Sequence, residues 1–570
     1  MTSTRSTPAP HDGAADIALV GGNVLTLEDP TSRARTVAIT GDRIVGVGDD
    51  RDVTALIGPR TRVVDLEGRT VLPGLIDQHL HLDHMATACS GRILDLSERV
   101  ATLAELAERV ATHAAQRPDD PWIRGGNWSE GSIGEIASGG RQASRTELDA
   151  ALPDRPVLLQ HFSIHAALVN AAALREAGID ATTPDPVGGR IERDPVSGEP
   201  TGLLIESAVH LVEQRIPGPG QAERVAELRH AMVALNRLGV TSVTDPMVTP
   251  QGLRDYAALR RGGAPTVRVH ALLHWGEAVG SSSSATIERA LATNGTTTGF
   301  GDDWLAVLGG KLFADGVPSQ RTAWLGTAYA DADTRGGLVL AGADDDERVA
   351  ELHRCIALLH RHRLAVQVHA IGDAAADAVL EGFARAQRDD PWPDARHVLI
   401  HGVLLRDEAI ERLAALDVSV ATNALIRYHA SPAMRPPLGD DRWAAGVAVR
   451  RMLDAGVRVS DGSDAPVVES DWRLALQALV TRETVESDGA AVGPGEAITA
   501  FEALRAWTTE PAYQQHADAD KGTIAVGKLA DLAIVDRDPL TVPAAELHAL
   551  EPLATIVGGR VVYDRDGLLA

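Results

Sequence analysis

Apolar runs alternate with longer stretches of helical periodicity through the middle of the chain. Eight of the runs are short and rich in Val, Leu and Ile, as buried strands are. These runs are residues 71–81, 240–245, 267–274, 305–311, 364–369, 397–401, 418–422 and 457–461. The helical stretches between them include residues 222–238, 344–361 and 406–416. Strands that alternate with helices predict βα units and a parallel sheet, and eight of them favour a (β/α)₈ barrel of the α/β class.

Residue types that bind metal ions occur at the ends of these runs. In a (β/α)₈ barrel the active site lies where the strands end. The polar residues at those ends are His79, His81, Lys311, His369, His401 and Asp464. A single histidine at such a place is more often a structural residue than a ligand. Because the six residues fall on five of the eight predicted strand ends, together they predict a metal site at one end of the barrel.

His79 and His81 are separated by one residue at the end of the first run. Residues i and i+2 of a strand point to the same face, so the two imidazoles are expected side by side. Neutral imidazole is the commonest metal ligand among side chains. The alternative interpretation is a pair of surface histidines, and the other residues gathered at the strand ends make it the weaker one.

The two ends of the chain show a different pattern, in which short alternating strands are separated by Gly-Asn and Gly-Asp turns. Such strands fall in residues 17–26, 36–48, 62–68, 522–536 and 554–564. We predict that they form a small composite β-sandwich domain of residues 16–70 and 520–570. The barrel then occupies residues 71–519. Residues 1–15 are polar and are predicted to be a disordered tail.

The composition narrows the range of partners. The 570 residues carry a formal net charge of −25, which argues against nucleic acid or an anionic membrane surface, since both require a basic footprint. Only Cys89 and Cys355 are present, so no disulfide framework is expected. No apolar run has the length of a membrane span, and the first residues lack the pattern of a signal peptide. We therefore expect a cytoplasmic protein that acts on a small molecule.

Lysine is rare in this chain, whose basic residues are nearly all arginine. The only lysines are Lys311, Lys521 and Lys528. Arginine stays protonated in proteins, whereas a buried lysine can lose its proton and be modified. Lys311 ends an apolar run, where a bare ammonium group would be costly to bury. We favour a chemical role for Lys311 over the alternative, a lysine that reaches solvent or pairs with Asp315.

Five motifs make the chain resemble a known family. They are Pro73-Gly-Leu-Ile-Asp-Gln-His-Leu-His81, Lys311-Leu-Phe-Ala-Asp-Gly316, His369-Ala-Ile-Gly-Asp373, Gly462-Ser-Asp-Ala-Pro466 and Gly527-Lys-Leu-Ala-Asp-Leu532. They are similar to motifs of the amidohydrolase superfamily, and in particular of its amidohydrolase-3 branch, which includes N-substituted formamide deformylases and YtcJ-like hydrolases. The resemblance covers almost the whole chain. It implies a TIM-type barrel with a composite β-sandwich, and an insertion at about residues 86–235 that helps to cover the pocket.

The resemblance also implies a first metal ion. His79 and His81 would bind the more buried of two divalent ions, and Asp464 would bind the same ion and transfer a proton. Asp461 is the competing choice for this acid, and the match of the Gly-Ser-Asp-Ala-Pro motif favours Asp464. Zn²⁺ suits these ligands, although Mn²⁺, Fe²⁺ and Co²⁺ would also fit.

The second metal ion implied by the resemblance would be bound by His369 and His401. Lys311, carboxylated by CO₂ to a carbamate, would bridge the two ions. A carbamate forms on a neutral amine, and burial in an apolar strand favours the neutral form. Glu206 would be the bridging carboxylate only if Lys311 is unmodified.

Other residues are weaker candidates. The predicted substrate contacts are Trp128, His165 and His274. His84 either supports the metal ligands or begins a loop. His397 lies at the start of its strand, so packing is its expected role.

The favoured function is a metal-dependent hydrolase that cleaves a carbon–nitrogen amide bond other than a peptide bond, with an N-substituted formamide or another N-acyl amide as substrate. One alternative is a mononuclear aminohydrolase that deaminates a heterocycle. Such deaminases usually have a glutamate three residues after the histidine of strand five, where this chain has Gly372. The other alternative is a metal-free scaffold or regulator, which should have lost ligands that are all present here. A homodimer is compatible with either type of enzyme.

Overall fold

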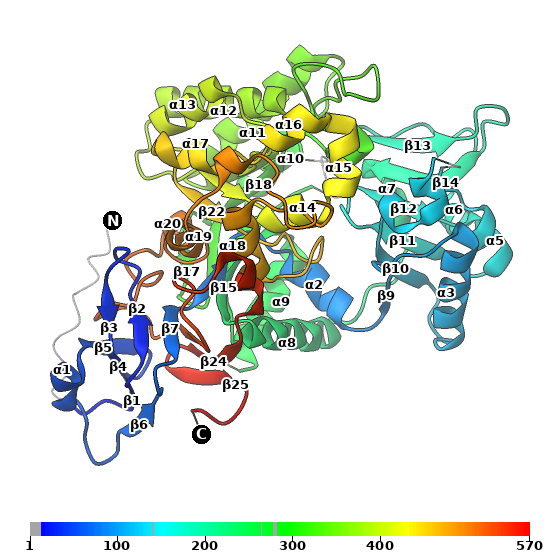
Figure 1. Ribbon diagram of the computed structural model, residues 1–570. Coiled ribbons are helices and arrows are strands. Elements are labelled where there is room, and N and C mark those ends of the chain that lie inside the picture. The colour runs from blue at the N-terminus through cyan, green and yellow to red at the C-terminus, as the bar shows by residue number, and fades with distance from the viewer. Residues whose placement is uncertain (1–12, 140–141, 264, 277–281, 570) are drawn as a thin grey trace.

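The computed structural model describes residues 13–139, 142–263, 265–276 and 282–569 (Figure 1). Residues 1–12, most of the predicted tail, lie outside this range. Ala15 already belongs to the fold, because its side chain is buried and its N–H donates to the carbonyl of Leu56. Across the described residues, no helix combines the length and the apolar character that crossing a membrane requires.

Eight parallel strands form the centre of the molecule. Their order in the sheet is β8-β15-β16-β18-β19-β20-β21-β22. Their bounds are β8 (Leu75–Asp77), β15 (Val240–Val248), β16 (Arg268–Leu273), β18 (Leu305–Phe313), β19 (Ala365–Ala370), β20 (Val398–His401), β21 (Ser419–Thr422) and β22 (Val459–Asp461). Helices α8 (Gln221–Arg237), α11 (Asp345–Arg361) and α13 (Asp407–Ala415) begin and end within one residue of the predicted stretches. The predicted α/β barrel is therefore confirmed as a nearly closed sheet.

The edge strands β8 and β22 are joined through their loops. No strand pairing connects them in the part of the chain that the structure describes. Instead, the N–H of Asp464 donates to the carbonyl of His79 at 2.6 Å, and the N–H of His81 donates to the carbonyl of Ala465 at 2.9 Å. These bonds hold the two loops together at the end of the barrel where the predicted metal ligands lie.

The first predicted strand is divided between two sheets. Residues Thr70–Pro73 form β7, which pairs with β2 (Asn23–Leu25) and β23 (Leu532–Val535), whereas β8 belongs to the barrel. Gly74 lies between β7 and β8. A Cβ atom there would come within 2.8 Å of the Cβ atom of Thr241. The barrel strand is therefore shorter than predicted. The chain passes from one sheet to the other at Gly74, which packs directly on Thr241 of β15.

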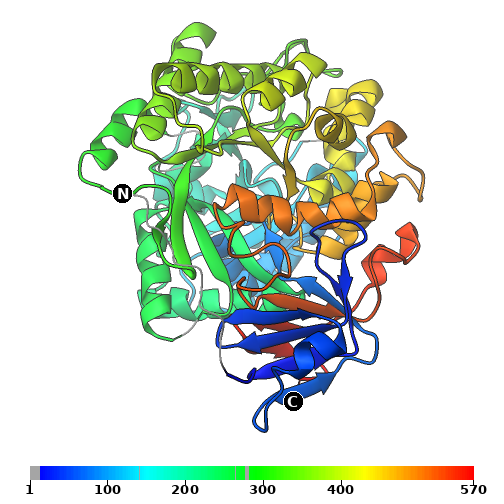
Figure 2. The same cartoon turned by 90° about the vertical axis from the view of Figure 1, so that its left-hand side faces the viewer.

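Strands from the two ends of the chain share one sheet, in the order β25-β24-β23-β7-β2-β3, and a second sheet has the order β5-β4-β1-β6. The remaining bounds are β1 (Ile17–Val20), β3 (Arg33–Ala34), β4 (Thr36–Thr40), β5 (Arg43–Gly48), β6 (Arg62–Asp65), β24 (Pro552–Val557) and β25 (Arg560–Asp564). Figure 2 shows these blue and red strands beside one another. Leu19, Val71 and Ile534 belong to one buried apolar cluster between them. The pairing of the chain ends is observed, while a separate β-sandwich domain with the predicted limits stays a prediction.

A further sheet lies in the long segment between β8 and β15. Its order is β13-β14-β12-β11-β10-β9, and Figure 1 shows it to the right of the barrel. The bounds are β9 (Ile93–Asp95), β10 (Ile123–Trp128), β11 (Val157–His161), β12 (Ala166–Val169), β13 (Gly189–Arg193) and β14 (Pro200–Glu206). The loop between β11 and β12 reaches the barrel, because Phe162 and Ile164 line the same cavity as His79.

Candidate metal centre

Two histidines and an aspartate meet where β8 and β22 end. The Nε2 atoms of His79 and His81 lie 3.4 and 3.0 Å from Oδ1 of Asp464. All three side chains are buried, and their ligand atoms lie within 4.8 Å of one another. The two rings are neighbours as predicted, with centroids 5.4 Å apart. Strand alternation is not the cause, because β8 ends at Asp77 and both histidines follow it in a loop.

The atoms of this group suit a divalent metal ion. Oδ1 of Asp464 has no hydrogen-bond partner by distance and angle, although the Nε2 atoms of both histidines lie within 3.4 Å of it. Buried polar atoms without partners each cost about 1 to 3 kcal/mol, and a bound cation would remove that cost. Burial lowers the pKa of His79 and of His81, which favours the neutral rings that bind metals. The residues present therefore fit an ion of the Zn²⁺ type.

A buried carboxylate holds together the two loops that carry these residues. Asp77 accepts hydrogen bonds from the N–H and the hydroxyl of Ser463 at 3.0 and 2.7 Å, and from the hydroxyl of Ser470 at 2.8 Å. Burial raises the pKa of Asp77 to about 6. Gly462 packs directly against the loop that carries His79, because a Cβ atom on Gly462 would lie 2.5 Å from the backbone nitrogen of His79. Asp77 thus positions the ligands, a role that the sequence motif did not indicate.

Asp461, the competing acid, is held elsewhere. Its carboxylate accepts hydrogen bonds from the N–H of Ala424 at 2.9 Å and from the indole N–H of Trp507 at 3.0 Å. Burial raises the pKa of Asp461 to about 8. Asp464 instead lines the cavity, and although burial opposes its charge, the adjacent histidine rings keep its pKa well below the ordinary value. The geometry favours Asp464 as the acid.

Lys311 lies near the end of β18 and lines the same cavity. Its amine has no hydrogen-bond partner and lies 4.5 Å from the centre of the Phe313 ring. Burial lowers its pKa to about 7, against the opposing effect of Asp464. Asp315, the alternative ion-pair partner, instead accepts three backbone N–H groups at 2.8 to 3.0 Å. Lys311 is therefore readily neutral, the form that a carbamate requires, and the carbamate itself stays a prediction.

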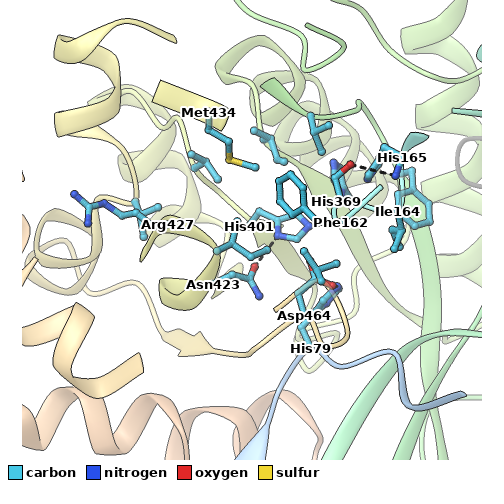
Figure 3. A pocket seen from close by; sticks show the side chains of 18 of the residues that line it. His79, Phe162, Ile164, His165, His369, His401, Asn423, Arg427, Met434 and Asp464 are labelled. Carbon is cyan, nitrogen blue, oxygen red and sulfur yellow. Dashed lines mark hydrogen bonds and ion pairs between the residues drawn. The ribbon is translucent and has the colours of Figure 1, made fainter. Parts of the chain in front are cut away.

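The histidines of β19 and β20 complete the group. Figure 3 shows the rings of His369 and His401 converging with His79, and the first two have centroids 4.5 Å apart. Nδ1 of His401 lies 2.6 Å from Oδ1 of Asn423, and Nε2 of His369 lies 3.2 Å from the carbonyl of Gly316. Burial lowers both pKa values, that of His401 to about 4. Metal-binding histidines usually have such a partner on their second nitrogen.

A histidine from the inserted sheet reaches the same cavity. The ring of His165 lies 5.5 Å from that of His369. Its Nδ1 is paired with Oε2 of Glu206 at 2.8 Å, and Oε1 of Glu206 accepts the hydroxyl of Thr322 at 2.9 Å. Burial opposes a charge on His165, but the Glu206 carboxylate outweighs it and raises the pKa of the ring. Glu206 therefore positions His165, and this placement does not support it as a bridge between metal ions.

Two of the predicted residues are packed away from the cavity. Trp128 lies in the core of the inserted sheet, where its indole N–H donates to the carbonyl of Leu159 at 2.8 Å. This placement does not support the predicted substrate contact, because the core of its own sheet encloses the ring. His397 accepts the N–H of Val366 at 3.0 Å and contacts Nδ1 of His360 at 2.8 Å, which agrees with its expected packing role.

His274 and His84 lie beside the metal pocket rather than in it. Nδ1 of His274 is 3.5 Å from the carbonyl of Lys311. The ring of His84 stacks on that of His81 with centroids 5.7 Å apart. Both histidines line a neighbouring cavity, so a contact of His274 with a substrate in the metal pocket is not supported.

Apolar side chains form most of the remaining wall. They include Phe162, Ile164, Phe313, Met434 and Trp443. Arg427 also lines the cavity, but Figure 3 shows its guanidinium turned away from the imidazoles. It donates to the backbone carbonyls of Arg482 and Val492 at 3.4 and 2.6 Å. The pocket therefore combines a polar floor with walls that exclude water. The sequence did not indicate these residues, since they come from separate loops and helices.

Comparison with known proteins assigns the family. The model of the amidohydrolase family matches residues 62–563. The chain belongs to the amidohydrolase family. This family member is 32% identical to the N-substituted formamide deformylase of Arthrobacter pascens over 564 residues, which cover 97% of this chain and 99% of the relative. It is 31% identical to the putative amidohydrolase YtcJ of Bacillus subtilis over 554 residues, or 96% and 99% of the two chains.

Solved structures of amidohydrolase-like fold agree with this assignment. An uncharacterized metal-dependent hydrolase from Pyrococcus horikoshii matches with a TM-score of 0.72 at 25% identity, covering 93% of this chain and 99% of its own. The family recognised from the sequence motifs is thereby confirmed. Together with the buried group of two histidines and an aspartate, this neighbour supports a metal-dependent hydrolase.

Proposed function

We propose that this amidohydrolase cleaves the carbon–nitrogen bond of a small amide other than a peptide, with an N-substituted formamide as the favoured substrate. The observation that carries the proposal is the convergence of His79, His81 and Asp464 next to the unpartnered amine of Lys311 in a largely apolar cavity. The similarity to an N-substituted formamide deformylase over nearly the whole chain supports the choice of substrate. The net charge of −25 fits a small-molecule substrate rather than nucleic acid.

The proposal includes two divalent metal ions, with Zn²⁺ the favoured type. The residues that would hold them are His79, His81, Lys311 in its carboxylated form, His369, His401 and Asp464. When bound, such ions lower the pKa of water and polarise the amide carbonyl.

The proposed mechanism uses Asp464 to move protons. Its Oδ1 has no hydrogen-bond donor, and its low pKa keeps it ionised at neutral pH. We propose that it takes a proton from the attacking water and delivers it to the leaving nitrogen, because an amine leaves only when protonated. We also propose that His165, which Glu206 holds at the cavity wall, donates a hydrogen bond to the amide oxygen.

The direct test combines metal analysis with substrate turnover. We expect about two metal ions per chain and the release of formate and butylamine from N-butylformamide. A chelator should abolish turnover, and Zn²⁺ should restore it. Asp464→Asn should lower kcat by about 10²- to 10⁴-fold while the protein stays folded by circular dichroism. Ammonia release from a heterocycle with one ion per chain would instead indicate a deaminase, and a folded protein without metal or turnover would indicate a scaffold.

A further inference from the structure

A second cavity of about 240 Å³ adjoins the metal pocket. It lies between the inserted sheet and the barrel, with walls from β10, β11, α7 (Ser207–Glu213) and α2 (Leu82–Cys89). We call it the Arg124 cavity, and its lining includes His84, Arg124, Asn127, Gln160, His210 and Met247. None of these residues takes part in the proposed hydrolysis.

The Arg124 cavity shares part of its wall with the metal pocket. Ile164 lines both cavities. Glu206 lines the Arg124 cavity, while its carboxylate holds His165 in the metal pocket. His84 lines the Arg124 cavity, and its ring stacks on the metal-pocket residue His81. A molecule bound at the metal centre therefore has the Arg124 cavity immediately beside it.

Arg124 is a partly buried cation that lines this cavity. Its Nε is buried and has no hydrogen-bond partner, and its guanidinium forms no ion pair with the described residues. Burial lowers its pKa, and the more distant Glu213 only partly opposes this effect. Arg427, which is buried, differs because its two terminal nitrogens donate to backbone carbonyls. A guanidinium nitrogen that is buried without such partners is unfavourable unless a ligand supplies them.

The carboxylates that line the Arg124 cavity are engaged by other groups. Glu206 is held by His165 and Thr322. Glu213 lies 4.0 Å from Nδ1 of His210. Asp83 accepts the backbone N–H of His84 at 2.7 Å. Among the described residues, none of the carboxylates that line the cavity is paired with Arg124.

We infer that the Arg124 cavity binds a carboxylate, and that this carboxylate belongs to the amine part of the substrate. The guanidinium of arginine matches a carboxylate with two parallel hydrogen bonds, which an ammonium group cannot do. The second part of the inference rests on the proposed function, because the formyl group of a formamide carries no substituent. The substrate class is then an ω-formamidoalkanoate, with the formamide at the metal centre and the carboxylate at Arg124.

The experiment uses a series of ω-formamidoalkanoates of increasing chain length and the matching ω-formamidoalkanamides, which lack the charge. We expect the ratio of kcat/KM between acid and amide to peak at one chain length. Arg124→Gln should lower that ratio by about 10- to 100-fold, mainly through KM. Arg190→Gln is the matched control, because Arg190 lies exposed on the same sheet and is paired with Glu192. An unchanged ratio in Arg124→Gln, or a peak that Arg190→Gln also removes, would overturn the inference.

A binding measurement separates the inference from the proposed function. Calorimetry on the metal-loaded protein should show hexanoate binding that is lost in Arg124→Gln and that competes with the formamide substrate. Binding of hexanoate or inorganic phosphate that needs Arg124 but does not compete would overturn the assignment to substrate and indicate a separate effector. If no formamide is cleaved at all, the proposed function fails, while loss of hexanoate binding in Arg124→Gln still supports the carboxylate site.

Discussion

The two ends of the barrel place buried lysines in opposite situations. Burial lowers the pKa of Lys311 and of Lys521 to about 7. Lys521 lies against the first residues of β15 and β16, where its amine donates to the hydroxyl of Ser242 at 2.6 Å and contacts Nε2 of His270 at 3.0 Å. The amine of Lys311, near the end of β18, has no hydrogen-bond partner. The same side chain is thus a structural hydrogen-bonding group at one end and an available reactant at the other.

Two histidines, one just before β20 and one at its end, show the same contrast between a residue with partners and one that is available. His397, just before the strand, has both ring nitrogens in hydrogen-bonding contact and stacks on Phe383 with centroids 4.8 Å apart. His401, at the end of the strand, is held through one nitrogen by Asn423 and faces the ring of His369. Burial lowers the pKa of both. The presence of partners, rather than burial or pKa, therefore distinguishes the structural residues from the candidate ligands.

The largest expected effect is at Lys311. Lys311→Ala should abolish the binding of the second metal ion and lower kcat/KM on the order of 10³-fold, because the proposed bridge is lost. Short carboxylates such as acetate should partly restore activity to this variant, since they imitate the carbamate. Lys311→Arg should not be active, because a guanidinium stays charged. Metal content and kcat/KM are the measurements.

Lys528 provides the matched control for the Lys311 variants. Its amine donates to the backbone carbonyls of Asp518 and Lys521, away from the metal pocket. Lys528→Ala should keep its metal ions and its turnover. Wild-type turnover in Lys311→Arg would show that the proposed bridge is wrong.

The next effect is expected at Asn423, which orients a candidate ligand. Its Oδ1 lies 2.6 Å from Nδ1 of His401, and its Nδ2 donates to the carbonyl of Gly462 at 2.8 Å. Asn423→Ala should weaken metal binding by about 10- to 100-fold, as loss of such outer partners commonly does. Competition with a chelator measures this affinity. Asn236→Ala is the control, because Asn236 donates to the carbonyls of Val240 and Thr266 at the other end of the barrel. Equal metal affinities in the two variants would contradict the role of Asn423.

The barrel and its ligand types could be predicted because they depend on local pattern. Val-, Leu- and Ile-rich runs predicted the strands, and helical periodicity located α8, α11 and α13 to within one residue. The division of the first strand into β7 and β8 could not be predicted. It depends on the contact between Gly74 and Thr241, which are far apart in the sequence.

The parts of the site that the sequence left unspecified all depend on tertiary contacts. Asp77 acts through Ser463 and Ser470, and no local pattern indicates that pairing. The role of Glu206 became clear only from its contact with His165. Trp128 was predicted to contact the substrate because it is an aromatic residue in the inserted segment. Its ring instead packs in the core of its own sheet, which its residue type alone does not indicate.

A smaller effect on stability is expected at the start of the barrel. Ser242→Ala removes the hydroxyl that accepts the hydrogen bond of Lys521, and it also removes the donor to Oε1 of Gln515 at 3.3 Å. The free energy of unfolding should fall by about 1 to 3 kcal/mol, as when buried polar groups lose a partner. Urea unfolding measures the change. Metal content and kcat/KM of the folded variant should stay at wild-type values. A loss of metal without a loss of stability would contradict the proposed contrast, in which Lys521 is structural and the metal ligands lie at the other end of the barrel.

The smallest expected change over a single pH unit is a difference in pH dependence between the wild type and Lys521→Met. An unfolded lysine keeps its proton up to about pH 10, whereas burial lowers the pKa of Lys521 to about 7 in the folded protein. Between these values the unfolded chain binds more protons, so the stability of the wild type should rise with pH, by at most about 1.4 kcal/mol per pH unit.

Lys521→Met lacks this proton, and its stability relative to the wild type should therefore decline as the pH rises above about 7. His270 does not disturb the comparison, because burial lowers its pKa well below the ordinary value and the ring stays neutral in this range. Other groups, Lys311 included, titrate in both proteins and cancel in the difference between their urea midpoints. A difference that stays constant from neutral to alkaline pH would mean that Lys521 keeps its proton when folded. The two buried lysines would then differ in charge as well as in partners.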